Sequence, residues 1–301
     1  MSTHRLGKLP AQPARPHLKL SAVLRERLAE PPASVDWQDD RITWPMYAND
    51  QIGDCTCAAV GHMVNQLTFY GSGTEQEPSE DHVIAMYSAI TGYRPGHPST
   101  DTGAYCQDVL AYWRKTGLDG HAIVAYAALD PSNLEEVKQA IAVFGTVYIG
   151  FNVTDAAEDA FDAGEVWDVK KGARNLGGHC VPMGAYDSAK KELYGVTWAA
   201  EFGMTEAYWQ KYVDEVWVVL DADGLTKAAA YFAGAPSFYD LGQQFAELTG
   251  EKNPIPAPQP QPTPVPPPPS PPAPSPTPVL DPRLVQAWQS MKAWASDNGL
   301  N

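Results

Sequence analysis

The stretch "DQIGDCTCAAVGHM", residues 50–63, contains two cysteines separated by one residue, directly after a Gly-Asp pair. Small apolar residues follow at helical spacing, so the pattern predicts a helix over 57–70 with Cys55 at its mouth. A helix N-terminus stabilises a thiolate, because its unpaired N–H groups and its dipole favour negative charge. The stretch therefore predicts a chemically used thiol, with Cys55 and Cys57 as alternative nucleophiles.

A thiolate nucleophile needs a partner that takes up a proton and delivers it to a leaving amine. The segment "GGHCVPMGAYD", residues 177–187, supplies His179 at the start of an expected strand. The two glycines before His179 let a ligand or another backbone approach closely. Cys55 and His179 are thus the candidate catalytic pair.

Composition restricts the possible partners and ligands. The chain has 301 residues and a formal net charge of −15, and such a field repels phosphate backbones and anionic lipid surfaces. We therefore expect no nucleic-acid partner. We also expect no membrane span and no signal peptide, because no long apolar run is present. Four cysteines are too few for a disulfide scaffold and lack zinc-ligand spacing, so we expect a reducing, cytoplasmic compartment or a particle packaged from one, without metal or cofactor.

The hydrophobic period changes along the chain from helical to alternating. Helices are expected first, and strands rich in Val, Tyr and Trp follow. Segregated helices and strands predict an α+β fold rather than alternating βαβ units. The expected helices are 57–70, 80–90, 103–116 and a capped helix from Asn133 to Gly145; the expected strands are 146–153, 165–169, 179–187, 192–199 and 214–221.

Both ends of the chain differ from the middle. Residues 1–33 contain several basic residues and prolines, and we expect an arm or vestigial pro-segment across the surface. Residues 251–282 are rich in proline, which favours an extended polyproline II linker. Residues 283–301 have the spacing of a short amphipathic helix, and a lone helix of this length needs a docking surface. Trp288, Met291 and Trp294 would contact either a protein partner or the chain's own domain.

Five segments, taken in order, resemble the papain-like cysteine peptidase superfamily. They are "SVDW" (34–37), "QIGDC" (51–55), "DTGAYCQDVLAYWRKTGL" (101–118), "GGHCVPMGAYD" (177–187) and "LYGVTWAAEFGMTEAYW" (193–209). The chain also resembles uncharacterised members encoded by actinobacteria and their phages. The resemblance implies a domain over 34–250: a helical half (34–130), an antiparallel sheet half (131–225) and a packed helix (236–249), with a substrate cleft between the halves.

The resemblance also implies roles for further residues. An oxyanion-stabilising amide lies six residues before the nucleophile, a position held by Asn49 relative to Cys55 and by Gln51 relative to Cys57. The Gly-Asp-Cys turn favours Cys55. Valine replaces the asparagine that orients the histidine, and the adjacent Thr197 binds an imidazole more weakly.

Two functions remain open at this stage. One is a peptidase or amidase that hydrolyses a peptide or amide substrate and is tethered through the proline-rich segment, as a phage virion component or lysis-related protein. The other is a catalytically degenerate papain-like domain that serves as a structural or interaction component of such a particle.

Overall fold

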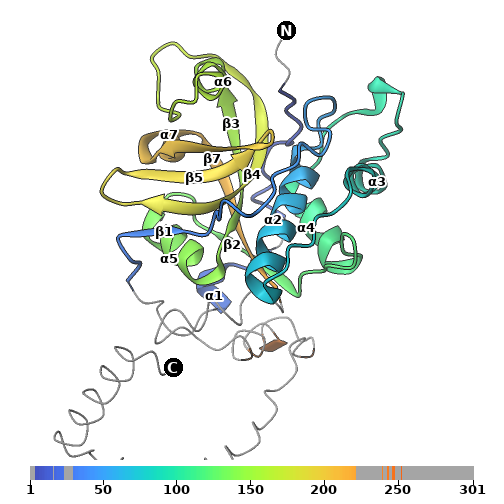
Figure 1. Ribbon diagram of the computed structural model, residues 1–301, viewed down its shortest axis with the longest axis horizontal. Helices are drawn as coiled ribbons and strands as arrows, with labels where there is room; N and C mark the ends of the chain where they lie inside the picture. The colour runs from blue at the N-terminus through green and yellow to red at the C-terminus, as the bar shows by residue number, and fades with distance from the viewer. Residues whose placement is uncertain are drawn as a thin grey trace, which may run out of the picture. The chain divides into compact units, whose positions relative to one another are not determined.

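The computed structural model describes residues 4–15, 17–23 and 30–221, together with the isolated residues 239, 243, 246, 247 and 252. The linker expected over 251–282 and the helix expected over 283–301 lie outside the described residues, apart from Lys252. The helix expected over 236–249 is described only at isolated positions. The rest of the described chain has the expected α+β fold, with helices packed against both faces of an antiparallel sheet (Figure 1).

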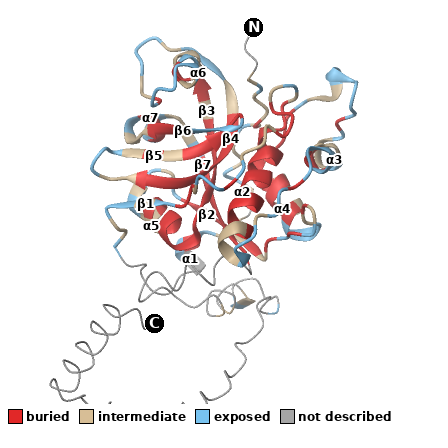
Figure 2. Ribbon diagram, in the orientation of Figure 1, coloured by how far each residue is buried: buried red, intermediate tan, exposed pale blue. Residues whose placement is uncertain are grey.

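The helical half is built around α2 (Cys55–Ser72), with α3 (Glu80–Thr91) and α4 (Cys106–Lys115) against it. Every residue of α2 from Cys55 to Thr68 is buried, and Figure 2 shows this helix almost entirely in red. A helix buried on all sides forms the centre of its domain rather than a surface layer. The three helices expected in this half are confirmed, and α2 begins two residues earlier than the pattern indicated.

The sheet is antiparallel, with strand order β2-β7-β3-β4-β5-β6, and β1 pairs with β4 outside this path. Long strands rich in Val and Tyr form its centre, as their β-propensity predicts. The strands are β1 (Ser34–Asp36), β2 (Ala125–Leu129), β3 (Val147–Thr154), β4 (Asn175–Asp187), β5 (Glu192–Thr197), β6 (Ala200–Thr205) and β7 (Val213–Leu220). The remaining elements are α1 (Leu20–Val23), η1 (Pro98–Thr100), α5 (Leu134–Phe144), α6 (Asp155–Asp162) and α7 (Glu206–Tyr212).

The strand expected over 165–169 is wrong. Its alternating pattern reflects the burial of Trp167, which makes one isolated bridge to Met204 and no ladder. The strand expected over 192–199 ends at Thr197, because Trp198 and Ala199 adopt positive φ values of 46° and 61°. Two consecutive left-handed residues reverse the chain into a tight hairpin, and the unexpected strand β6 follows.

Two strands come from the part of the sequence that we expected to be helical. β2 pairs with β7, and β1 pairs with β4. β2 reads AYAAL, and alanine has low β-propensity, so composition did not reveal it. A boundary at residue 130 therefore does not separate helices from strands.

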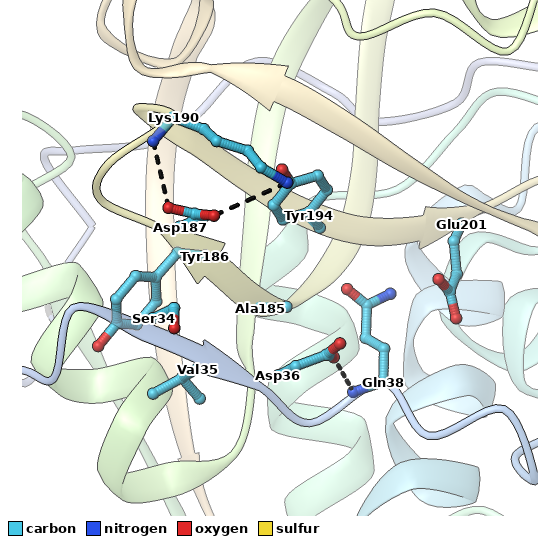
Figure 3. Close-up of a pocket in the computed structure, with 10 residues that line it drawn as sticks. All are labelled: Ser34, Val35, Asp36, Gln38, Ala185, Tyr186, Asp187, Lys190, Tyr194 and Glu201. Carbon is cyan, nitrogen blue, oxygen red and sulfur yellow. Dashed lines mark hydrogen bonds and ion pairs between the residues drawn. The ribbon is translucent and has the colours of Figure 1, made fainter.

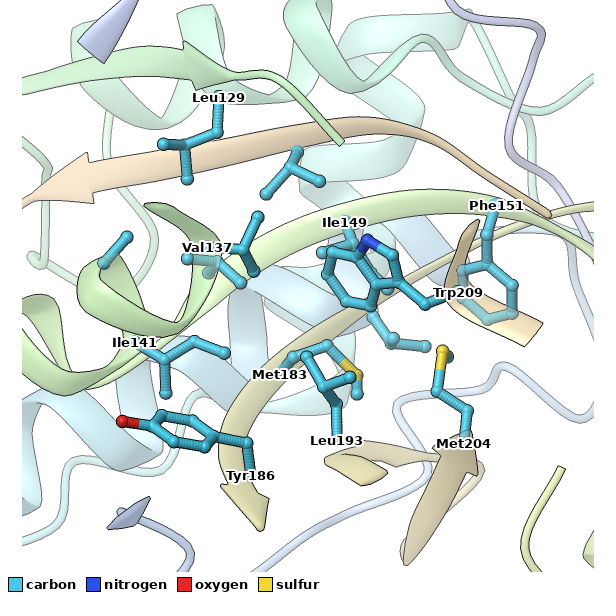
Figure 4. Packing of buried hydrophobic residues seen from close by; sticks show 14 of the residues in the cluster. Leu129, Val137, Ile141, Ile149, Phe151, Met183, Tyr186, Leu193, Met204 and Trp209 are labelled. Carbon is cyan, nitrogen blue, oxygen red and sulfur yellow. The ribbon is translucent and has the colours of Figure 1, made fainter. Parts of the chain in front are cut away.

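Two hydrophobic clusters stabilise the domain. One lies between the sheet and α5, and Figure 4 shows its packing around Ile149, Met183 and Trp209. The other surrounds α2 and includes Tyr148, Cys180 and Trp217 from the sheet. The Tyr148 hydroxyl donates to the carbonyl of Thr56 over 2.9 Å. The sheet thus packs directly on the first turn of α2, where Cys55 lies.

Candidate active site

Cys55 is the first residue of α2 and is buried. Its thiol contacts the backbone N–H groups of Gly7 and Cys180, which lower its pKa, but burial raises that pKa to about 12. In this conformation the group is therefore a neutral thiol. Cys180 directly follows His179 in β4, so the contact brings the nucleophile candidate beside the histidine-bearing strand.

Cys57 is fully buried among the apolar residues around α2. Burial raises the pKa of its thiol well above the usual range. Its backbone N–H donates to the Asp54 carbonyl as part of the helix start. Of the two thiols, Cys55 alone has the backbone contacts to Gly7 and Cys180 that place it at the junction of the two halves.

His179 is held between two neighbouring side chains on the sheet. Its Nε2 lies 2.6 Å from the Thr197 hydroxyl, and its ring stacks on Trp198 with centroids 4.6 Å apart. The edge of Phe151 packs against the same imidazole. Nδ1 is buried and has no hydrogen-bond partner among the described residues. Burial lowers the pKa of His179 to about 3, so the imidazole is neutral here.

The positive φ of Trp198 places its indole over His179, a role that sequence inspection missed. Residues in sparsely populated backbone regions cluster at functional sites, because the surrounding structure must hold them there. The hairpin between β5 and β6 thus presents Thr197 and Trp198 to the same imidazole. The "VTW" sequence alone did not reveal the left-handed turn.

The two oxyanion candidates differ in their surroundings. The Asn49 side-chain amide donates to the Ile52 carbonyl over 3.3 Å and to Asp54 Oδ1 over 3.2 Å. Asn49 is buried, whereas Gln51 is exposed. Burial raises the pKa of Asp54 well above its usual range. Asn49 therefore supports the turn before the nucleophile.

Residues 4–9, which we call the arm segment, lie between the two halves rather than across the outer surface. The Lys8 N–H donates to the Gly178 carbonyl, the Leu9 N–H to the Ala104 carbonyl, and the Ala104 N–H to the Gly7 carbonyl. Gly178 lies on β4 and Ala104 just before α4. The arm segment thus bridges the sheet and the helical half.

Glycines permit this close approach. A Cβ atom at Gly7 would lie 1.7 Å from the Gly53 carbonyl oxygen, and one at Gly178 would lie 2.3 Å from the Lys8 carbonyl oxygen. The expectation that the glycines before His179 admit another backbone is confirmed, and the backbone admitted is that of the chain itself. At the start of the segment, His4 stacks on Trp198 with ring centroids 4.1 Å apart.

All four cysteines are free. Cys106 and Cys180 lie close together, with their sulfur atoms 3.7 Å apart. A disulfide requires about 2.05 Å between sulfur atoms. The sulfur atoms of Cys55, Cys106 and Cys180 therefore remain separate thiols around the arm segment.

A separate cavity of about 460 Å³ lies where β1 meets β4 and β5 (Figure 3). It is lined by acidic and aromatic residues, among them Asp36, Glu201 and Tyr194. None of the candidate catalytic residues lines it. This cavity is therefore separate from the candidate pair Cys55 and His179.

Among residues 4–15, 17–23 and 30–221, no group of three or more His, Cys, Asp or Glu side chains is arranged to hold a metal ion. Over the same part of the chain, no helix combines the length and apolar character that a membrane crossing requires.

Comparisons with known proteins give structural matches only. No protein-family model matches the sequence, and no curated protein matches it. Xylellain, a cysteine protease from Xylella fastidiosa, is similar in structure: the TM-score is 0.58 at 17% identity, over 73% of this chain and 97% of that one. Procathepsin B S9 from Trypanosoma congolense matches with a TM-score of 0.51 at 14% identity, over 73% of this chain and 87% of that one. The chain therefore has the papain-like fold.

Proposed function

We propose that the chain is a cysteine peptidase or amidase, with Cys55 as nucleophile and His179 as general acid and base. One arrangement carries the proposal: the Cys180 N–H contacts the Cys55 thiol, while Thr197 and Trp198 hold the preceding histidine. A thiol beside an imidazole that is oriented by a third group can carry out acyl transfer.

The reaction transfers one acyl group in two stages. His179 takes the thiol proton, and the Cys55 sulfur attacks the amide carbonyl carbon. His179 then returns this proton to the leaving amine, and the C–N bond breaks to leave a thioester. Water, deprotonated by His179, hydrolyses the thioester to a carboxylic acid and restores the thiol. The net reaction is amide plus water to acid plus amine.

The oxyanion would be held by backbone and side-chain donors near the helix N-terminus. The Cys55 backbone N–H is one donor. We assign the second to the Gln51 amide, because the Asn49 amide is already engaged with Ile52 and Asp54. Gln51→Ala should therefore reduce kcat more than KM, by about 10- to 100-fold on the scale of a lost oxyanion donor.

In the conformation described, the arm segment covers this machinery. The Gly7 N–H contacts the thiol, and the Gly7 carbonyl accepts a hydrogen bond from the Ala104 N–H. Withdrawal of the segment would admit water, which lowers the pKa of a buried thiol and raises that of a buried histidine. The arm segment thus excludes water from the site and keeps the Cys55 thiol and the His179 imidazole neutral.

Thiol labelling tests the proposed roles. The protein is treated with iodoacetamide or an epoxide at pH 7.5, and the labelled cysteine is identified by mass spectrometry. We expect labelling of Cys55 in the Gly7→Ala variant, in which the arm segment is displaced, and loss of that labelling when His179→Ala is added. Cys57→Ser is the matched control and should leave the labelling unchanged.

A catalytically degenerate domain is the second candidate, supported by the same closed site with its neutral thiol and imidazole. If Cys55 in Gly7→Ala reacts no faster than a free thiol, and its labelling rises only above about pH 8, the degenerate domain replaces the peptidase. Preferential labelling of Cys57 would instead reverse the assignment of the nucleophile.

We also propose that residues 251–301 tether the domain to a protein partner, as in a phage particle. The support is the sequence alone: a proline-rich segment followed by Trp288, Met291 and Trp294 at helical spacing. Replacing Trp288 and Trp294 by alanine should release the partner without lowering the Tm of the domain. A lower Tm with the partner retained would mean that these residues pack on their own domain.

A further inference from the structure

Lys8 is the most deeply buried charged residue of the arm segment: its side chain is 1% exposed. Lysine is almost never fully buried unless it is paired. Its Nζ lies 2.7 and 2.8 Å from the two carboxylate oxygens of Asp214, and 3.2 Å from Glu215 Oε1. The arm segment thus inserts one ammonium group between two acidic residues of β7.

The structure provides a defined pocket for this side chain. Gly150 of β3 pairs with Glu215, and a Cβ atom at Gly150 would lie 2.1 Å from Lys8 Cε. The Trp217 indole N–H donates to Glu215 Oε2 over 2.9 Å, which fixes the carboxylate. The absence of a side chain at Gly150 makes room for the methylene chain of Lys8, and the Glu215 carboxylate pairs with the Lys8 ammonium group. We call Gly150, Asp214, Glu215 and Trp217 the lysine pocket.

The lysine pocket adjoins the nucleophile. Gly150 also pairs with Cys180, whose N–H contacts the Cys55 thiol. Gly7, which precedes Lys8, donates the other N–H to the same thiol. A side chain in the pocket is thus attached to a backbone that passes directly over Cys55.

The charge balance favours a cation in this pocket. Glu215 is 8% exposed, and loss of its partner would leave a buried carboxylate uncompensated, which is strongly unfavourable. Burial alone would lower the pKa of Lys8, but Glu215 and Asp214 outweigh it and raise that pKa. A ligand that displaces the arm segment is best accommodated when it also brings a positive charge.

We propose that the lysine pocket recognises a lysine side chain of a peptide, and that it selects substrates bearing that side chain next to the bond attacked by Cys55. This inference rests on the proposed peptidase function for its second part. The arm segment occupies the pocket with the same chemistry that a substrate would use.

Binding is measured first, without any need for turnover. The probe is a fluorescein-labelled synthetic peptide with the sequence of residues 4–13, and the protein is full-length Lys8→Ala carrying Cys55→Ala. We expect the peptide with lysine to bind at least about 10-fold more tightly than the same peptide with norleucine, as for loss of a partner of a buried ion pair. Equal affinity of the two peptides would overturn the proposal.

Variants of the pocket make the binding test specific. Glu215→Gln removes a carboxylate, and Gly150→Ala fills the space of the lysine stem without changing charge. In both variants, the lysine peptide and the norleucine peptide should bind with similar affinity. Asp214→Asn, at a side chain that is 33% exposed, is the milder variant if Glu215→Gln unfolds. Asp81→Asn, at an exposed carboxylate of α3, is the control and should keep the preference.

Turnover separates the two proposals. Full-length Lys8→Ala with Cys55 intact is assayed on fluorogenic peptides that differ only by lysine, norleucine or glutamate at one position. A kcat/KM at least about 10-fold higher for lysine than for norleucine supports substrate selection. Hydrolysis with no lysine preference overturns the selection and leaves the peptidase. Lysine-dependent binding without Cys55 labelling or hydrolysis overturns the peptidase and leaves a lysine-recognition pocket.

Discussion

Thr197 Oγ1 lies 2.6 Å from Nε2 of His179, on the imidazole nitrogen opposite to the unpartnered Nδ1. The Thr197 hydroxyl therefore orients the His179 ring through Nε2 and leaves Nδ1 for proton transfer. A hydroxyl is a neutral partner, so it orients the ring but stabilises the imidazolium less than a carboxylate does.

Thr197→Val should retain the fold and reduce kcat. Loss of an aspartate in this position of a serine peptidase costs about 10⁴-fold, and a neutral hydroxyl should cost about 10-fold. The measurement is kcat of the Gly7→Ala protein with and without Thr197→Val. Thr197→Ser keeps the hydroxyl and should recover most of the rate. An equal kcat with threonine, valine or serine at position 197 would exclude an orienting role.

Gly7→Ala should open the site. The added methyl would overlap the Gly53 carbonyl oxygen at 1.7 Å, and backbone cannot yield to that degree. We expect the labelling rate of Cys55 at pH 7.5 to rise at least about 10-fold, because the desolvation that suppresses the thiolate is relieved. Ala14→Ser, at an exposed position of the N-terminal region, is the control. An unchanged rate in Gly7→Ala would show that the arm segment does not limit access.

Acid should destabilise the folded protein through its buried histidines. Burial lowers the pKa of His179 to about 3 and that of His62 to about 4, so the unfolded chain, with values near 6.5, binds protons first. The contribution of these two histidines to the free energy of unfolding should therefore not change above about pH 6.5. The free energy of unfolding should fall as the pH decreases towards about 4.

Urea unfolding at pH 7.5, 6.0 and 5.0 checks this dependence. His62→Gln should remove part of the loss of stability without affecting Cys55 labelling, because the His62 Nε2–H donates to the Pro45 carbonyl, outside the active site. A stability that rises on acidification over this range would contradict the assignment of neutral buried imidazoles.

Cys57→Ser should lower stability rather than reactivity. A hydroxyl at a position with 0% exposure has to leave water, and an unsatisfied buried polar group costs about 1–3 kcal/mol. The urea midpoint should fall while Cys55 labelling in the Gly7→Ala background stays the same. If Cys57→Ser abolished labelling and left the urea midpoint unchanged, Cys57 rather than Cys55 would be the nucleophile.

Local patterns in the sequence were sufficient for α2, α3, α4, α5 and most of the sheet, whereas α1, α6 and α7 were not predicted. The small-residue run after Cys55 predicted α2, and the capping box at Asn133 predicted α5, because both signals act within a few residues. β2 and β6 escaped detection, since one is alanine-rich and the other follows a hairpin made by non-glycine residues with positive φ.

The position of the arm segment depends on pairing between distant parts of the chain. Lys8 and Asp214 are separated by 206 residues, and no periodicity or motif connects them. The basic residues and prolines of residues 1–33 indicated only an arm across the surface, and it is the three-dimensional path of β3, β4 and β7 that specifies where the lysine lies.

The arm segment is part of the same chain as the site that it covers, and this covalent connection determines how Cys55 can become accessible. A tethered ligand has an effective concentration of the order of millimolar that is independent of how much protein is present. Dilution therefore cannot expose Cys55, and the labelling rate should be the same in nanomolar and micromolar solutions. Relief requires a competing peptide in excess, a mutation in the segment, or a cut in the connection to it.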